Sequence, residues 1–351
     1  MIEQKANRNP TIDILRGIAM LMVVLGHTMT GCTINAENSF LFNVIWTLQM
    51  PLFILISGYV TKYSRPITSG KACGKFVCKK TFAYLMPWAV WTFVVRGLLF
   101  KQTLYLNVKY ILFHMDSGYW FLFTLWTIVM IYGIAQFLSE RICAGRNKFA
   151  KLLVVTIGYV VGMSILASIG FAMGLSFLCI KLTLYYMPFY FVGYLFGQFD
   201  TELFEHKYGN QIKEITTSGC FIGWIALLVR FNFYSIGDGG IRIILRALAS
   251  MMGCIAVCGF VSKLFVNGPK PEKGRGGGLL CNIGVHSLEI YLIHYLLLSM
   301  VKFDQTPKFG EPAGIMIIVL NYILTVCIAY GITRLLNRNR LLDMVLFGKI
   351  R

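Results

Sequence analysis

Residues 152–171 read LLVVTIGYVVGMSILASIGF, twenty residues in a row without a charged side chain. An α-helix rises about 1.5 Å per residue, so this run can cross the roughly 30 Å hydrocarbon core of a bilayer. The whole chain has the same character: 57% of its 351 residues are hydrophobic and 14% are charged, with a mean hydropathy of +0.67. A soluble domain carries about a quarter charged residues. The composition therefore excludes a soluble globular protein and predicts an all-α, polytopic membrane protein.

Other stretches share the length and apolarity of residues 152–171. No internal repeat is visible, and no connecting segment is long enough to form a second domain. We therefore predict about ten transmembrane helices in a single membrane-embedded domain, residues 1–351, with no extra extracytoplasmic domain. The ten predicted spans are 13–31, 39–61, 82–100, 119–138, 152–171, 182–198, 215–233, 243–262, 279–301 and 313–335.

The net charge of +18 is a property of the connections between the spans. Lys and Arg gather in alternate short loops, as the positive-inside rule requires of cytoplasmic segments. This placement argues against nucleic acid as a partner and for contact with a lipid bilayer. It also predicts that both termini are cytoplasmic. The clearest basic segment follows the second span and contains Lys62, Arg65, Lys71, Lys75, Lys79 and Lys80.

The ten cysteines are scattered, mostly inside apolar runs. They form no CxxC pair and no Cys/His spacing of the kind that holds a metal ion. We predict reduced, structural cysteines and no metal site.

Arg16 and His27 are ionisable residues inside the first predicted span, where charge is costly and is usually there for function. Arg16 and His27 are eleven residues apart, which is three helical turns plus about 20°. Both side chains therefore share one face, roughly 16 Å apart. An arginine near the cytosol suits a phosphate group of an acyl-coenzyme A. A deeper imidazole can take the proton of an attacking hydroxyl. The geometry favours one ligand-filled cavity that both groups face. The alternative remains open: Arg16 reaches to the interface and His27 bonds to a backbone carbonyl.

Four groups of residues carry a family resemblance. Residues 13–19 (DILRGIA) and 25–27 (LGH), with Arg16 and His27 inside them, resemble the opening signature of the acyltransferase 3 family. These are membrane O-acyltransferases of bacterial glycans, and they include fucose 4-O-acetylase-like proteins. Residues 51–59 (PLFILISGY), 119–122 (YWFL) and 287–294 (SLEIYLIH) are similar to later motifs of that family and occur in the family's order.

The resemblance implies roles for residues of the first spans. His27 is the expected catalytic base, and Arg16 is expected to bind the donor, with Asp13 as its ion-pair partner or as a helix cap. Ser57 and Tyr59, at the end of the second span, are expected to bind the donor, or else to pack helices. The family usually has arginines in the basic segment that follows. This chain has Lys79 and Lys80 there, and lysine binds phosphate without the bidentate fork of arginine.

The late motif supplies further candidates. Ser287, Tyr291 and His294 are spaced by four and three residues, which predicts one polar stripe on a helix. We expect this stripe to bind the acceptor or to handle a proton, with His294 as a second catalytic group. Glu289 lies off that stripe and is a catalytic candidate whose partner the sequence does not reveal. Trp120 is expected to stack on a sugar or on adenine, or to anchor the chain at the interface.

Together these residues predict a membrane acyltransferase of the bacterial cytoplasmic membrane. The resemblance implies transfer of an acetyl group from acetyl-coenzyme A, a donor substrate and not a resident cofactor. The implied acceptor is a hydroxyl of a surface or extracellular polysaccharide, or of its lipid-linked precursor. The alternative is a polysaccharide exporter without catalysis. Transporters often contain paired repeats, and none is visible here.

Overall fold

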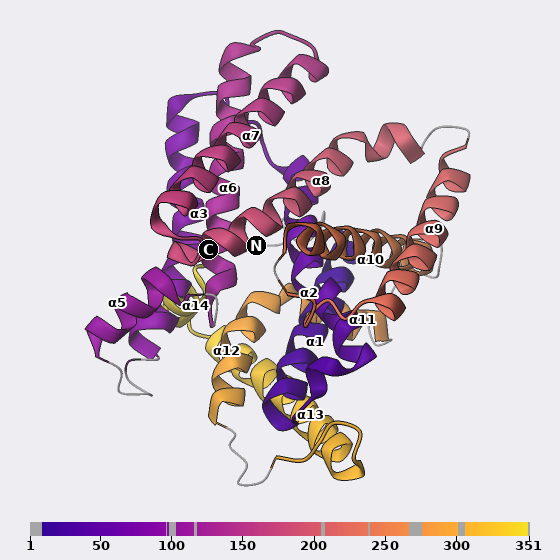
Figure 1. Cartoon of the computed structure of the whole chain (residues 1–351). Helices are drawn as coiled ribbons and strands as arrows, with labels where there is room; N and C mark the ends of the chain where they lie inside the picture. The colour runs from indigo at the N-terminus through magenta and orange to yellow at the C-terminus, as the bar shows by residue number, and fades with distance from the viewer. Residues whose placement is uncertain are drawn as a thin grey trace. The chain divides into compact units, whose positions relative to one another are not determined.

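The computed structural model describes residues 9–95, 97, 103–115, 118–204, 208–237, 239–266, 276–300 and 306–349. Within these ranges the regular secondary structure is helical (Figure 1), apart from one isolated parallel bridge between Ile34 and Lys308. The main helices are α1 (Pro10–Cys32), α2 (Phe40–Tyr59), α3 (Gly70–Ala89), α5 (Leu104–Phe113), α6 (Trp120–Ile142), α7 (Lys148–Met173), α8 (Ile180–Phe204), α9 (Gly209–Arg230), α10 (Gly240–Val266), α11 (Gly276–Val285), α12 (Ser287–Met300), α13 (Pro312–Leu336) and α14 (Arg340–Phe347). A π-helix, η4 (Val90–Val95), extends α3.

Eight of the described helices are long and apolar enough to cross a membrane, and the bent pair α11 and α12 makes a ninth if it counts as one span. The prediction of an all-helical, polytopic membrane protein is confirmed. The predicted span 82–100 is the one without a counterpart among these helices. It begins within α3, which starts twelve residues earlier in the basic segment, and its end falls partly outside the described residues.

One predicted span is not a single helix. The predicted span 279–301 is interrupted, because α11 ends at Val285 and α12 begins at Ser287 with a bend of 78° between them. The sequence stays apolar across the bend, so hydropathy alone does not reveal it. The backbone N–H of His286 closes α11 by donating to the carbonyls of Asn282 and Ile283. A break at membrane depth is tolerated where protein satisfies the freed backbone groups.

The chain forms two compact units, which we describe separately. Unit 1 comprises Met1–Val60 and Phe191–Arg334, and unit 2 comprises Thr61–Tyr190 and Leu335–Arg351. In unit 1, α1 packs against α2, α10, α11 and α12, and α9 packs against α10 (Figure 1). In unit 2, α6 packs against α3 and α7, and α14 packs against α3. Helix α8 contributes residues to both units.

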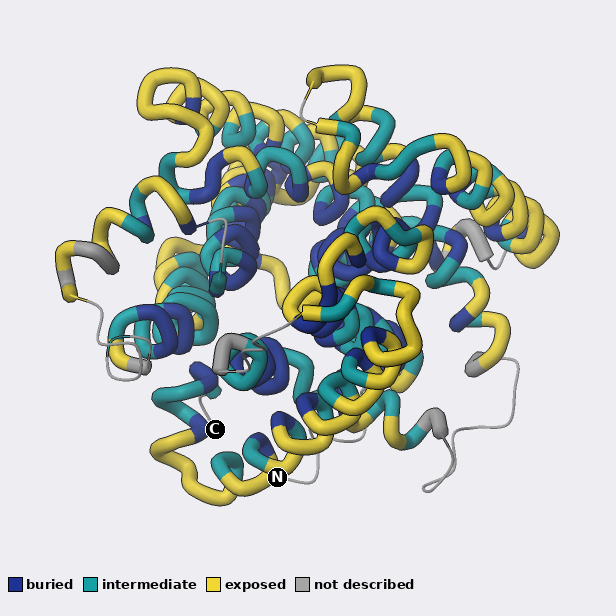
Figure 2. The backbone as a smooth tube through the Cα atoms, turned by 60° about the horizontal axis from the view of Figure 1, so that its bottom comes forward, coloured by how far each residue is buried: buried dark blue, intermediate teal, exposed yellow. Residues whose placement is uncertain are grey.

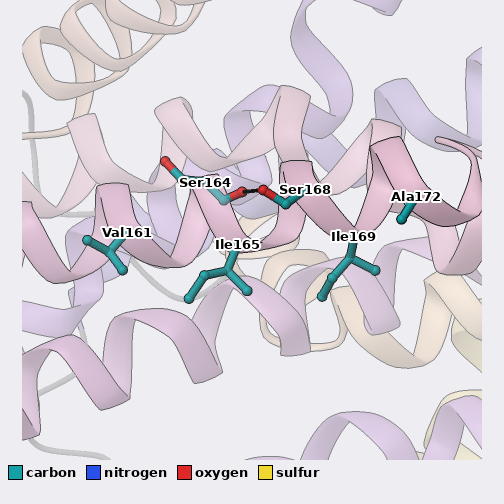
Figure 3. Close-up of a pocket in the computed structure, with 6 residues that line it drawn as sticks. All are labelled: Val161, Ser164, Ile165, Ser168, Ile169 and Ala172. Atoms are coloured by element: carbon teal, nitrogen blue, oxygen red, sulfur yellow. Dashed lines mark hydrogen bonds between the residues drawn. The ribbon is translucent and has the colours of Figure 1, made fainter.

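The outward side of α7 shows how the chain meets lipid. Buried and exposed residues alternate along the helices (Figure 2), and on α7 most exposed positions are apolar, with Ile165 57% and Ile169 41% exposed. An open hollow runs along this side (Figure 3), where the hydroxyls of Ser164 and Ser168 donate to carbonyls of their own helix at 3.0 Å. These hydroxyls need no water. The surface is therefore suited to acyl chains.

Asn43 of α2 joins α2 to the end of α9. Its Nδ2 donates to the carbonyls of Leu228 and Phe231 at 3.2 and 2.7 Å, and its Oδ1 accepts from the N–H of Phe233 at 2.9 Å. The last carbonyls of a helix have no partner within it, and Asn43 supplies one in an environment without water. This amide is a structural clamp.

Replacing Asn43 with leucine is expected to lower the stability of the folded protein by at least about 2 kcal/mol, because three backbone groups lose their partner while buried. The measurement is the thermal denaturation midpoint of the purified protein in detergent. Asn321→Leu on α13 is the matched control, since the Asn321 amide donates only to Ile317 of its own helix. Equal midpoints for the two variants would contradict the clamp.

Candidate active site

Helix α1 carries the two groups that the sequence singled out. Its first turn is capped by the Asn9 side chain, which accepts from the N–H of Thr11 at 3.0 Å, and Pro10 occupies the first turn, where its missing N–H costs nothing. The helix then runs without a break to Cys32. Arg16 and His27 therefore share one face of one rigid element, about three turns apart.

At the Arg16 end, a buried carboxylate lies beside the cation. Asp13 is 2% exposed, and its Oδ1 lies 3.8 Å from a guanidinium nitrogen of Arg16, whose side chain is 26% exposed. The thiol of Cys281 on α11 lies 4.0 Å from the other carboxylate oxygen. Part of the Arg16 side chain therefore stays exposed beside the ion pair. The predicted pairing of Asp13 with Arg16 is present.

Helices α1 and α11 touch backbone to backbone beside this ion pair. A Cβ placed on Gly17 would lie 2.2 Å from the carbonyl oxygen of Leu280, and one on Gly284 would lie 1.7 Å from that of Asp13. No side chain fits at either position, so the two glycines set the distance between the helices. Small residues allow this close approach in membranes, where van der Waals packing holds helices together.

At the other end, His27 meets two rings of α12. Its ring centroid lies 5.5 Å from that of His294 and 6.1 Å from that of Tyr295. His294 is fully buried, whereas His27 is exposed. Tyr291, 7% exposed, places its ring 5.8 Å from His294. His27 thus packs on a buried wall and remains accessible on its other side.

The orientation of His294 fixes its chemistry. Its Nδ1 lies 3.0 Å from the carbonyl oxygen of Ile290, and because a carbonyl only accepts, Nδ1 carries the hydrogen. The neutral ring then has its lone pair on Nε2. That atom is buried and has no hydrogen-bond partner among the described residues. His294 therefore offers a proton acceptor next to His27.

The face of α1 between Arg16 and His27 is packed. Met20 and Val23 lie between them on this face and are 0% and 1% exposed, whereas Ile18 and Leu25 on the opposite side are half-buried. His27 is therefore accessible on the packed side of α1 and not on its more open side. The expected single open cavity is replaced by two accessible ends with apolar side chains between them.

Glu289 has a partner that the sequence did not reveal. It is 1% exposed, and its Oε1 lies 3.0 Å from Nδ1 of His286, the residue at the bend between α11 and α12. The imidazole donates to the carboxylate. The ring of Tyr330 meets His286 edge-on at 6.0 Å. Ser287, the first residue of α12, lies one turn before Tyr291.

The two polar side chains at the end of α2 form hydrogen bonds within the protein. The Ser57 hydroxyl donates to the carbonyl of Phe53 at 2.8 Å, and the Tyr59 hydroxyl donates to Asp200 of α8 at 2.6 Å. A Cβ on Gly193 would lie 2.0 Å from the carbonyl oxygen of Leu55, so α8 approaches α2 closely here. Donor binding by Ser57 and Tyr59 stays a prediction.

Three predicted residues lie in unit 2. Lys79 is exposed, and the ammonium of Lys80 lies 5.7 Å from the centroid of the Tyr84 ring. The indole of Trp120 stacks on Tyr186, with centroids 5.4 Å apart and planes at 16°. The structure describes these residues separately from Arg16 and His27, and their roles stay predictions.

Four polar or aromatic residues near these groups were not among the predicted site residues. Gln49 and Asp200 are polar residues near or inside apolar runs, a signal that was available. His286 stands three residues before Glu289, which is a helical contact distance. Tyr295 had no signal, because one more aromatic residue in an aromatic-rich chain looks like packing.

This chain is similar to known proteins over most of its length. The acyltransferase domain family matches residues 9–334. The nodulation protein NolL of Sinorhizobium fredii is 27% identical over 211 residues, 55% of this chain and 50% of that protein. NolL of Mesorhizobium japonicum is 24% identical over 232 residues, 62% of this chain and 57% of that protein. The chain thus spans about half the length of these curated relatives, and no solved structure matches it. The chain belongs to the acyltransferase 3 family of membrane acyltransferases.

Proposed function

We propose that this protein transfers an acetyl group from acetyl-coenzyme A to a hydroxyl of a surface or extracellular polysaccharide, or of its lipid-linked precursor. One observation carries the proposal. His27 is accessible on the packed side of α1, and the fully buried His294 supports it from α12. An imidazole held in this way can act on a proton at neutral pH, which oxygen nucleophiles require for acyl transfer.

The reaction is a single displacement at a thioester. His27 takes the proton from the acceptor hydroxyl while the oxygen forms a bond to the acetyl carbonyl carbon. The carbon–sulfur bond then breaks, and the leaving thiolate of coenzyme A takes up the proton that His27 holds. The lone pair on Nε2 of His294 can accept a hydrogen bond from the reacting groups, which would orient them against His27.

Arg16 is proposed to hold a phosphate of the donor. Its guanidinium lies 3.8 Å from Asp13 and its side chain is 26% exposed, and arginine binds phosphate as a planar fork. Lys79 and Lys80 are proposed, from the family resemblance alone, to bind phosphate groups of the donor. Because Met20 and Val23 fill the face between Arg16 and His27, the pantetheine arm has to displace them or pass beside them.

The basic loops support a cytoplasmic location for both termini. With α1 starting in the cytosol, Arg16 lies near the inner surface and His27 about 16 Å further along the helix. We therefore propose the bacterial cytoplasmic membrane as the location, with the donor arriving from the cytosol. The acceptor would meet His27 deeper in the membrane.

The test compares cells with and without the gene by mass analysis of their surface polysaccharides. We expect O-acetyl groups to disappear without the gene and to return with the wild-type copy. Membrane vesicles given acetyl-coenzyme A labelled in the acetyl group should transfer the label to base-treated polysaccharide from the same cells, since base removes O-acetyl esters. Loss of the polysaccharide from the surface, with no labelled product in vesicles, would favour an exporter and reject the proposal.

A further inference from the structure

Helix α2 carries two buried amides with opposite surroundings. Asn43 is 3% exposed, and backbone groups of the α9 end satisfy both ends of its amide. Gln49 is 8% exposed, yet its Oε1 is buried without a hydrogen-bond partner among the described residues. A buried polar atom without a partner costs free energy. Asn43 is explained by packing, and Gln49 is not.

The position of Gln49 links it to the candidate active site. A Cβ on Gly26 would lie 3.2 Å from Gln49 Oε1 and 3.1 Å from a methyl carbon of Ile45. Gly26 precedes His27, and consecutive Cα atoms are about 3.8 Å apart. The Gln49 amide therefore lies one residue away from the proposed base, on the helix that packs beside it. Gly26 leaves the space that the amide occupies.

Two buried acceptor atoms without a partner among the described residues lie on helices that pack against α1. Gln49 Oε1 of α2 lies beside Gly26, the residue before His27, and Nε2 belongs to the His294 ring of α12, which lies beside the His27 ring. Both atoms accept hydrogen bonds, so the ligand that satisfies them has to bring donors. Thioester carbonyls and phosphates bring none, and the pantetheine arm of coenzyme A brings only its two amide N–H groups and one hydroxyl; an unchanged KM for acetyl-coenzyme A in the test below distinguishes that arm from the acceptor. A sugar presents hydroxyls, each of which donates and accepts, so it can satisfy an amide in either orientation.

The geometry points to Gln49 as an acceptor-binding residue, whose side-chain amide holds a hydroxyl of the carbohydrate next to His27. This inference rests on the proposed acetyl transfer and names the group that positions its acceptor. The cost of the orphan oxygen in the free protein is then recovered when the sugar binds. Sites that trade stability for function commonly have this character.

Gln49→Met tests the inference, because methionine has nearly the same shape and no hydrogen-bonding amide. With base-treated polysaccharide as the acceptor, we expect the acceptor KM to rise about tenfold, since one hydrogen bond to a buried amide is lost. The KM for acetyl-coenzyme A should stay unchanged. The thermal denaturation midpoint should stay equal or rise, because an unsatisfied buried oxygen is removed. Gln49→Glu, which keeps an acceptor oxygen, should recover part of the acceptor affinity.

Two controls separate the possible roles. Gln136→Met makes the same chemical change on α6 of unit 2, where Gln136 is half-buried, and should leave both KM values unchanged. Asn43→Leu should lower the midpoint and leave the acceptor KM unchanged. A purely structural Gln49 would show a lower midpoint without a selective change in acceptor KM, and that result would overturn the inference. An unchanged acceptor KM would overturn it as well.

A binding measurement separates failure of this inference from failure of the proposed function. Base-treated polysaccharide is titrated against His27→Ala protein and against the His27→Ala, Gln49→Met double variant. About tenfold weaker binding by the double variant supports the Gln49 site even if the wild type transfers no acetyl group. Equal binding by the two rejects the site even if the wild type is an active acetyltransferase.

Discussion

Replacing His27 with alanine is expected to lower the rate of acetyl transfer by at least about a hundredfold, the usual contribution of a positioned general base. The protein should still insert and fold, because the His27 side chain is exposed and its removal leaves an open space, not a closed cavity. The effect should fall on kcat, since the base acts in the transition state and not in substrate binding. The measurement is label transfer from acetyl-coenzyme A to base-treated polysaccharide in vesicles with matched protein levels.

His114→Ala is the matched control for this prediction. His114 is an exposed histidine of unit 2, and its loss should leave transfer at the wild-type rate. Added imidazole should restore part of the activity of His27→Ala, because the vacated space is accessible and a free imidazole can enter it. A His27→Ala protein with wild-type kcat would remove the base from the mechanism.

The arrangement on α1 could be read from the sequence because it depends on one helix. A fixed rotation per residue places Arg16 and His27 on the same face whatever packs around them. The pairing of Asp13 with Arg16 follows from the same rule at a spacing of three residues, and the structure confirms the contact. Among the described residues, the eight helices that are long and apolar enough to cross a membrane were also predictable, since each follows from a single apolar run.

Features that depend on contacts between two helices could not be predicted from the sequence. The bend at His286 interrupts no apolar run, so the sequence does not show it. Glu289 contacts His286, the residue at this bend, and that contact was not predicted either. The packing of Met20 and Val23 is another such case. An apolar residue can line a channel or fill a packed core, and the sequence does not distinguish the two. The sequence therefore could not show that Met20 and Val23 fill the space between Arg16 and His27.

The sequence also does not show whether a buried amide such as that of Gln49 has hydrogen-bond partners. A glutamine within a membrane span is a recognisable signal, because its amide needs partners. The sequence does not reveal whether another helix supplies them. Asn43 and Gln49 lie six residues apart on α2 and differ entirely in this respect. Only the surroundings of each amide separate a structural clamp from a candidate binding group.

The second large effect is expected at Gly284. Gly284→Ala should cost more than about 3 kcal/mol of stability, the upper end of overpacking penalties, because the new Cβ would meet the carbonyl of Asp13 at 1.7 Å. The obstacle is backbone, so no side-chain rotation relieves it. Helices α1 and α11 have to separate, and Asp13 and Arg16 move with α1. We expect a lower denaturation midpoint, loss of acetyl transfer and faster thiol labelling of Cys281, which faces Asp13 from α11.

Gly331→Ala on α13 controls for the substitution itself. A Cβ on Gly331 would meet nothing within 4 Å, and alanine favours a helix over glycine by up to about 1 kcal/mol. That variant should therefore melt at the wild-type temperature or above it and keep full activity. If Gly284→Ala behaved in the same way, α1 and α11 would not be in backbone contact. Arg16 would then lose the packed support that orients it, and the assignment of Arg16 to donor phosphate would lose its physical basis.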